Sequence, residues 1–174
     1  MDVSRAEQQL AAIASLSGAL DELGLDYWLF GGWAVDFWVG SITRDHDDID
    51  VAARRSDQDA IKAALLEVGW RHTPAVDEVV GTRYQLGGVE TEFTFVVPDA
   101  DGRVFIPLDQ PLMWSAEPFG SDRRELLGVS CRTIPLSLLT EGKRKFVDKG
   151  RAEAAKDRAD YEALTKLQGM TSLE

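Results

Sequence analysis

Residues 31–51 read GGWAVDFWVGSITRDHDDIDV, and this stretch decides the fold of the chain. Near its end, Ile49 and Val51 alternate with acidic residues, which is the period of a β-strand. Alternate residues of a strand share a face, so Asp48 and Asp50 point the same way, away from the core. Two carboxylates so close together are costly unless a cation neutralises them. Because Mg²⁺ prefers oxygen ligands, the pattern predicts a divalent-cation site at these two aspartates.

The glycine pair at the start of the stretch follows a short apolar run, residues 27–30, that we expect to form a buried strand. Gly31 and Gly32 end this strand, and residues 33–39 then read as a short helix closed by a glycine. Glycine lets the backbone approach a bulky anion, and the N–H groups at a helix N-terminus favour phosphate. The glycine pair is therefore a candidate phosphate contact.

Two basic residues are further candidates for phosphate binding. Arg44 lies just before the acidic strand, where it could hold a phosphate with two hydrogen bonds or pair with Asp45 or Asp47. Lys143 falls in the middle of the apolar face of a helix predicted near the C-terminus. A lysine on a buried face needs an anion beside it, and either a triphosphate or Asp157 could supply one.

A third carboxylate is expected on a later strand. Residues 89–95 alternate between apolar and polar side chains, which places Glu90 and Glu92 together on the outward face. Either glutamate could reach a cleft beside the aspartate pair. A carboxylate there could act as a general base and deprotonate an acceptor hydroxyl. The residues alone leave the choice between the two open.

The other elements follow from the periodicity of apolar residues and from glycine stops. A capping box of Ser4 and Glu7 opens the first helix, and Ser56 caps another. Residues 103–124 carry no clear signal. The predicted fold class is α+β (mixed α/β), a mixed sheet flanked by helices with further helices at the C-terminus. The predicted ranges are helices over 4–23, 33–39, 56–69, 136–149 and 151–167, strands over 27–30 and 48–52, and hairpins over 79–97 and 126–134.

The charge balance narrows the choice of partners. The chain has 30 acidic and 19 basic residues, a net charge of −11. Such a surface repels phosphate backbones, so nucleic acid is a poor partner, whereas a cationic small molecule would be attracted. The single cysteine, Cys131, excludes an internal disulfide. We see neither an apolar run of about 20 residues nor a signal-peptide pattern, and therefore expect a cytoplasmic protein without a membrane span.

Taken together, the glycine pair and residues 43–50, TRDHDDID, resemble the signature of small antibiotic nucleotidyltransferases. The groups concerned are the aminoglycoside 2″-nucleotidyltransferases and the lincosamide nucleotidyltransferases, both of the polymerase-β-like nucleotidyltransferase superfamily. The resemblance implies that Asp48 and Asp50 bind Mg²⁺. It also implies that Gly31 and Gly32 contact the phosphates of a nucleotide.

The resemblance further implies a third acidic residue on a later strand, acting as metal ligand or general base. Alignment on that strand makes Glu92 the choice, with Glu90 as the alternative. It also implies a polymerase-β-like nucleotidyltransferase core within residues 1–100. Residues 101–174 would then be the acceptor-side segment and the closing helices, and the two parts would form one compact unit.

The function implied is transfer of a nucleoside monophosphate, AMP from Mg·ATP, to a hydroxyl of an aminoglycoside or lincosamide antibiotic. In this scheme Asp48, Asp50 and Glu92 are catalytic and hold the metal, while Arg44 and Lys143 help the glycine pair to bind the triphosphate. Two alternatives stay open: a toxin-like enzyme that modifies a protein or a tRNA, and a nucleotide-binding module without catalysis. A homodimer is also compatible with the sequence.

Overall fold

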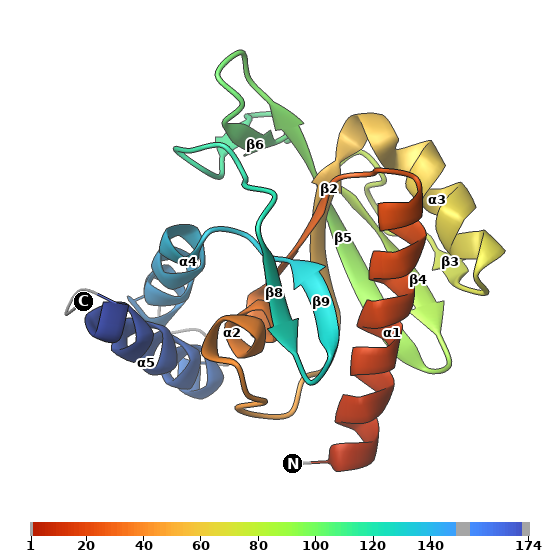
Figure 1. Ribbon diagram of the computed structural model, residues 1–174. Coiled ribbons are helices and arrows are strands. Elements are labelled where there is room, and N and C mark those ends of the chain that lie inside the picture. Colours follow the sequence, from red (N-terminus) through yellow and green to blue (C-terminus); the bar gives the residue numbers. More distant parts are fainter. Residues whose placement is uncertain (1, 149–153, 172–174) are drawn as a thin grey trace.

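The computed structural model describes residues 2–148 and 154–171 of the chain. Within these residues, seven strands form one mixed sheet and two further strands form a separate hairpin, with helices on both sides (Figure 1). The predicted α+β class, a mixed sheet flanked by helices, is confirmed. The helices are α1 (Val3–Glu22), α2 (Gly31–Val39), α3 (Gln58–Glu67), α4 (Leu136–Asp148) and α5 (Ala154–Thr171), and a 3₁₀ turn spans Arg55–Asp57.

The main sheet has the order β1-β2-β5-β4-β3, and β6 and β7 extend it from the end of β5. β2 pairs parallel with β5 and antiparallel with β1, which places β2 inside the sheet. As predicted, Ile49 and Val51 of β2 are fully buried. The strands are β1 (Tyr27–Phe30), β2 (Ile49–Arg54), β3 (Arg71–Thr73), β4 (Gly81–Leu86), β5 (Val89–Pro98), β6 (Val104–Ile106), β7 (Leu112–Met113), β8 (Arg123–Leu126) and β9 (Val129–Arg132).

Two tight turns connect the hairpins. Gly87 and Gly88 join β4 to β5 with φ angles of 54° and 88°, in the left-handed region that glycine adopts without strain. This confirms the predicted two-glycine hairpin. Leu127 and Gly128 join β8 to β9 in the same way, with φ angles of 49° and 81°. The second hairpin begins at Arg123, earlier than expected, within the segment 103–124 to which we assigned no element.

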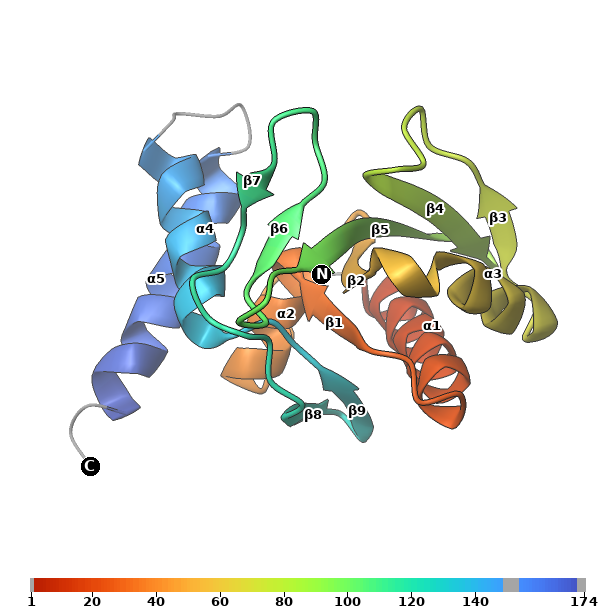
Figure 2. The same ribbon diagram turned by 90° about the horizontal axis from the view of Figure 1, so that it is seen from above.

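The helices form two groups around the sheet. α1 and α3 lie beside each other on one face, whereas α4 and α5 pack on each other and on α2 beyond β1 (Figures 1 and 2). No helix within the described ranges combines the length and the apolar character that crossing a membrane would need. The arrangement brings the C-terminal helices next to the loop that leads into β2.

The predicted apolar face of α1 is confirmed, but its start is not where the capping box put it. Asp2 is the N-cap, and its side chain accepts a hydrogen bond of 3.2 Å from the backbone N–H of Arg5. Ser4 therefore lies inside the first turn, because an acidic cap upstream takes its place. The buried residues of the predicted face are Ala6, Leu10, Ile13, Leu16 and Leu20. The prediction that Leu23 also lies on this face is wrong, because it caps the end of the helix and its side chain is exposed.

Other boundaries also differ from the prediction. α2 begins at Gly31, so the glycine pair lies in its first turn and no separate turn precedes it. Ser56 belongs to the 3₁₀ turn, and α3 starts only at Gln58. The short strands β3, β6 and β7 were missed because two or three residues carry no periodicity. Lys149 at the predicted end of the penultimate helix and Arg151 at the predicted start of the last helix lie outside the described residues.

Trp28 of β1 ties the long segment before β8 to the sheet. Its side chain is only 2% exposed, and its Nε1–H donates a 2.7 Å hydrogen bond to the backbone oxygen of Gly120. Its ring meets that of Phe119 edge-on at 4.9 Å. The tryptophan thus anchors the segment around Phe119 and Gly120 to the sheet by both hydrogen bonding and aromatic packing.

We predict that Trp28→Phe lowers the free energy of unfolding by about 1–3 kcal/mol, because it removes this hydrogen bond and leaves a small cavity. Equilibrium unfolding in urea measures the change. A difference below about 0.5 kcal/mol, the usual size of a neutral substitution, would contradict the anchoring role.

Candidate functional site

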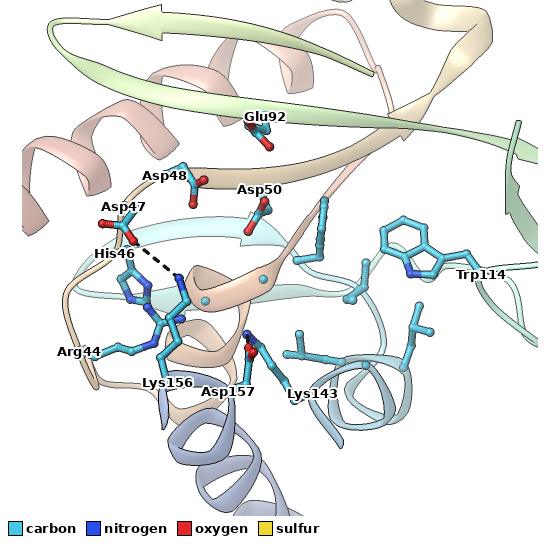
Figure 3. A pocket seen from close by; sticks show the side chains of 17 residues that line it. Arg44, His46, Asp47, Asp48, Asp50, Glu92, Trp114, Lys143, Lys156 and Asp157 are labelled. Carbon is cyan, nitrogen blue, oxygen red and sulfur yellow. Dashed lines mark hydrogen bonds and ion pairs between the residues drawn. The ribbon is translucent and has the colours of Figure 1, made fainter. Parts of the chain in front are cut away.

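A cavity of about 480 Å³ lies between the main sheet and the two C-terminal helices (Figure 3). Asp48, Asp50 and Glu92 lie on one side of it, and Lys143 and Lys156 lie on the other (Figure 3). The cavity thus has a cluster of carboxylates on one side and two lysines, one of them paired with Asp157, on the other. The apolar side chains that complete its wall are Phe30, Trp114, Ile134, Leu138 and Leu139.

The three carboxylates form one cluster. Asp48 immediately precedes β2, Asp50 lies on β2, and Glu92 lies on β5 directly beside Asp50 in the parallel register. One oxygen from each carboxylate lies within 4.8 Å of the others. Glu90 points from the same face of β5 but is not among the described residues that line the cavity. The geometry therefore brings the two predicted aspartates together with Glu92.

The electrostatics of the cluster reflect crowded negative charge. Burial raises the pKa of Asp50 to about 7, and the neighbouring charges of Asp48 and Glu92 raise it as well. Burial and the charge of Asp48 also raise the pKa of Glu92, while Arg83 on β4 opposes this shift. Carboxylates with raised pKa values in a cavity are the groups expected to bind a cation or accept a proton.

The glycine pair is required by the side chains of the site. A Cβ atom on Gly31 would overlap the carboxylate of Asp50, and the φ angle of Gly31 is +65°. A Cβ atom on Gly32 would overlap the guanidinium of Arg44 and the ring of His46. These glycines therefore let the first turn of α2 lie against the acidic strand. Their contact with phosphate stays a prediction.

A buried pair holds the loop before β2. His46 is 4% exposed and Asp36 of α2 is fully buried, and His46 Nε2 lies 2.6 Å from Asp36 Oδ2. Asp36 also accepts hydrogen bonds from the backbone N–H and the hydroxyl of Thr43, at 3.0 and 2.6 Å. This network fixes the loop that carries Arg44 and Asp48 to the cavity.

The two predicted phosphate-binding cations have carboxylate partners in α5. One alternative was that Arg44 pairs with the side chain of Asp45 or Asp47. Its guanidinium instead binds both oxygens of Asp160, each at 2.9 Å. Lys143 pairs with Asp157 at 3.2 Å, as one alternative held, and also with Asp160 at 2.8 Å. Both cations line the cavity, and their role toward phosphate stays a prediction.

Two residues that line the cavity, Lys156 and Trp114, were not predicted from the sequence, and neither was Asp160, which pairs with cavity residues but is not among the described residues that line it. Lys156 on α5 lies 3.6 Å from Asp47, and Trp114 follows β7 and packs edge-on against Phe30 at 5.1 Å. Asp160 lies in α5 and reaches Arg44. The helical spacing of residues 156, 157 and 160 could have grouped the α5 side chains on one side of a helix. Trp114 follows a two-residue strand, so nothing in the sequence marked it.

Comparisons with known proteins identify the family of the chain. A family model described as Aminoglycoside-2″-adenylyltransferase matches residues 12–164. A curated 2″-aminoglycoside nucleotidyltransferase of Klebsiella pneumoniae is 36% identical over 69 residues, which cover 40% of this chain and 39% of that protein. One of Escherichia coli is 43% identical over 60 residues, covering 33% and 34%. The two alignments thus span little more than a third of the length of these relatives.

Solved structures show the same fold over nearly the whole chain. ANT(2″)-Ia in complex with adenylyl-2″-tobramycin is similar with a TM-score of 0.71 and 20% identity, covering 95% of this chain and 92% of that one. The lincomycin-bound lincosamide antibiotic adenylyltransferase LnuA has a TM-score of 0.70 and 18% identity, covering 92% and 97%. Since the family model spans most of its length, this chain belongs to the aminoglycoside-2″-adenylyltransferase family.

Proposed function

We propose that this protein transfers AMP from Mg·ATP to a hydroxyl group of an aminoglycoside. The observation that carries the proposal is a single cavity with Asp48, Asp50 and Glu92 on one side and cations of α4 and α5 on the other. Acidic groups on one side suit a metal and a hydroxyl acceptor, and basic groups opposite suit a polyphosphate. The names of the family and of its curated relatives support an aminoglycoside as the acceptor.

The donor set fits a divalent cation. Three carboxylates lie within 4.8 Å of one another, and the raised pKa of Asp50 reflects its burial and the charges of Asp48 and Glu92, which Lys143 and Lys156 oppose only in part. Asp48, Asp50 and Glu92 would hold Mg²⁺, which suits oxygen ligands. When bound, the ion would neutralise charge on the phosphates of the nucleotide.

Glu92 is our candidate for the general base. Burial and the charge of Asp48 raise its pKa, which makes its carboxylate a better proton acceptor. The acceptor hydroxyl would give its proton to Glu92 as its oxygen forms a bond to the α-phosphorus of ATP. The bond from the α-phosphorus to the bridging oxygen would break, and pyrophosphate would leave with the electron pair. Arg44, Lys143 and the glycine pair are our candidates for holding the triphosphate.

The alternatives are less well supported. An intact carboxylate cluster counts against a module without catalysis, and a net charge of −11 counts against a tRNA acceptor. A lincosamide is the second candidate acceptor, since Phe30 and Trp114 give the cavity an apolar part suited to a less charged molecule. The cytoplasmic location and the homodimer remain predictions.

The direct test is pyrophosphate release from Mg·ATP with a panel of aminoglycosides and lincosamides. We expect release that depends on an aminoglycoside. Release with lincosamides alone would name the other acceptor. ATP binding without release for any member of the panel would contradict the proposal and favour a macromolecular acceptor or a binding module.

We predict that Asp48→Asn and Asp50→Asn each reduce turnover by at least about a thousandfold, because each removes a charged ligand at the reacting centre. Far-ultraviolet circular dichroism checks that the fold is kept. Glu90→Gln is the matched control: it removes a carboxylate from the same face of β5 and should retain turnover within about threefold. Loss of turnover in Glu90→Gln with activity kept in Glu92→Gln would reverse the assignment of the base.

The raised pKa of Asp50 predicts a stability effect in metal-free protein. Its folded pKa of about 7 exceeds the ordinary value of 3.8 for an aspartate, so the folded state holds this proton to higher pH than the unfolded state does. This group therefore costs stability as pH rises from about 4 to 7. With a chelator present at about pH 8, the free energy of unfolding of Asp50→Asn should exceed that of the wild type by on the order of 1–3 kcal/mol. The gain should shrink toward about pH 5, and a gain independent of pH would contradict this origin.

The glycine contact predicts a separate outcome. Gly31→Ala should displace the Asp50 carboxylate and strain the backbone, with a loss of activity of at least about tenfold and a lower melting temperature. Gly18→Ala is the control, since a Cβ atom there meets nothing within 4 Å and the residue lies inside α1. That variant should keep its activity and gain about 0.5–1 kcal/mol in stability. Equal effects of the two substitutions would contradict the proposed contact.

A further inference from the structure

Asp160 of α5 joins two of the cations that line the cavity, Arg44 and Lys143. It is 1% exposed, and its Oδ1 accepts a 2.9 Å hydrogen bond from Arg44 Nε. Its Oδ2 accepts a second bond from the Arg44 terminal nitrogen at 2.9 Å and also lies 2.8 Å from Lys143 Nζ. A single carboxylate oxygen therefore contacts a guanidinium and an ammonium that come from segments about 100 residues apart.

This shared oxygen decides how close the two positive charges can lie. Arg44 and Lys143 repel each other, and the anion between them compensates that repulsion. Burial alone raises the pKa of Asp160, but its contacts with Arg44 and Lys143 outweigh this, and the pKa lies below its usual range. Asp160 thus stays ionised at neutral pH, and the side-by-side position of the cations depends on it.

Both cations keep donors that can serve a ligand. The guanidinium of Arg44 uses Nε–H and one N–H of each terminal nitrogen in bonds to Asp160 and to the backbone oxygen of Asp45. A guanidinium has five N–H donors and an ammonium has three, so these bonds and the Lys143 contacts to Asp157 and Asp160 leave donors over. Arg44 also lies against Gly32, in the first turn of α2 at the cavity wall.

We propose that Asp160 is a positioning residue, which holds Arg44 and Lys143 together as a paired donor for the pyrophosphate portion of the nucleotide. This inference rests on the proposed function. Donors fixed before the reaction stabilise charge that develops on a leaving group without the cost of reorganising. Two cations held by one buried anion meet this requirement, whereas two independent surface side chains would each lose conformational entropy on binding.

The test compares the binding of two probes by Asp160→Asn. Inorganic tripolyphosphate with Mg²⁺ carries the phosphates without a nucleoside, and calorimetry measures its Kd and that of Mg·ATP without any need for turnover. Asn keeps the size of the side chain but removes its charge. We expect both Kd values to rise about tenfold or more, since loss of charge-assisted bonds lets the cations separate. The KM for ATP should rise likewise, and the KM for the acceptor should stay within about twofold.

Asp26→Asn is the matched control. Asp26 also bridges two arginines, Arg54 and Arg132, but none of these three residues is among the described residues that line the cavity. Its binding constants and activity should stay at the wild-type values even if its melting temperature falls. A merely structural role of Asp160 would lower kcat through a smaller folded fraction and leave every Kd and KM unchanged, which would overturn the proposal.

A second variant covers the case in which Asp160→Asn does not fold. Arg44→Lys keeps the positive charge but cannot bind both oxygens of Asp160. It should weaken tripolyphosphate binding in the same direction, and a wild-type Kd in this variant would overturn the proposal. If the wild-type protein releases no pyrophosphate with any acceptor, the proposed function fails, while the binding comparison still decides the role of Asp160. Absence of tripolyphosphate binding by the wild type would overturn that role as well.

Discussion

The parallel pairing of β2 with β5 is the constraint on which the site depends. This register puts Asp50 directly beside Glu92, and the alternation along β2 brings Asp48 to the same side. Backbone pairing and the burial of Ile49 and Val51 supply the favourable free energy that keeps three like charges together. The raised pKa of Asp50 is the electrostatic cost of that arrangement. A cation would relieve it, so stability of the sheet and affinity for metal are linked.

The cations of the cavity come from other parts of the chain than the acidic cluster, and ion pairs within the protein compensate their charges. Lys143 and Arg44 face two buried carboxylates, Asp157 and Asp160, so the summed charge of these four side chains is close to zero before any ligand enters. Buried charges are tolerated only when paired in this way. The bonds of Arg44 to Asp160 also attach α5 to the loop before β2, so the position of α5 and the position of this cavity residue depend on each other.

The fold and half of the site could be predicted because their signals are local. Alternation along one strand places Asp48 and Asp50 on one face, and helical periodicity places Lys143 on a buried face. The choice of Glu92 over Glu90 depends on the register of two strands far apart in sequence, which local patterns do not contain. The Asp160 partner of Arg44 was missed for the same reason, since it follows from the packing of α5. The division of the chain near residue 100 stays a prediction.

Transfer of label from ATP tests the central claim most directly. ATP labelled at the α-phosphate or at the γ-phosphate would be incubated with the protein, Mg²⁺ and an aminoglycoside, and the acceptor isolated. The arrangement of the acidic cluster opposite Lys143 and Lys156 predicts that the α-label alone appears on the aminoglycoside, with the γ-label in pyrophosphate. Appearance of the γ-label on the acceptor would mean phosphoryl transfer, and an unlabelled acceptor would mean no transfer; either result would contradict the account.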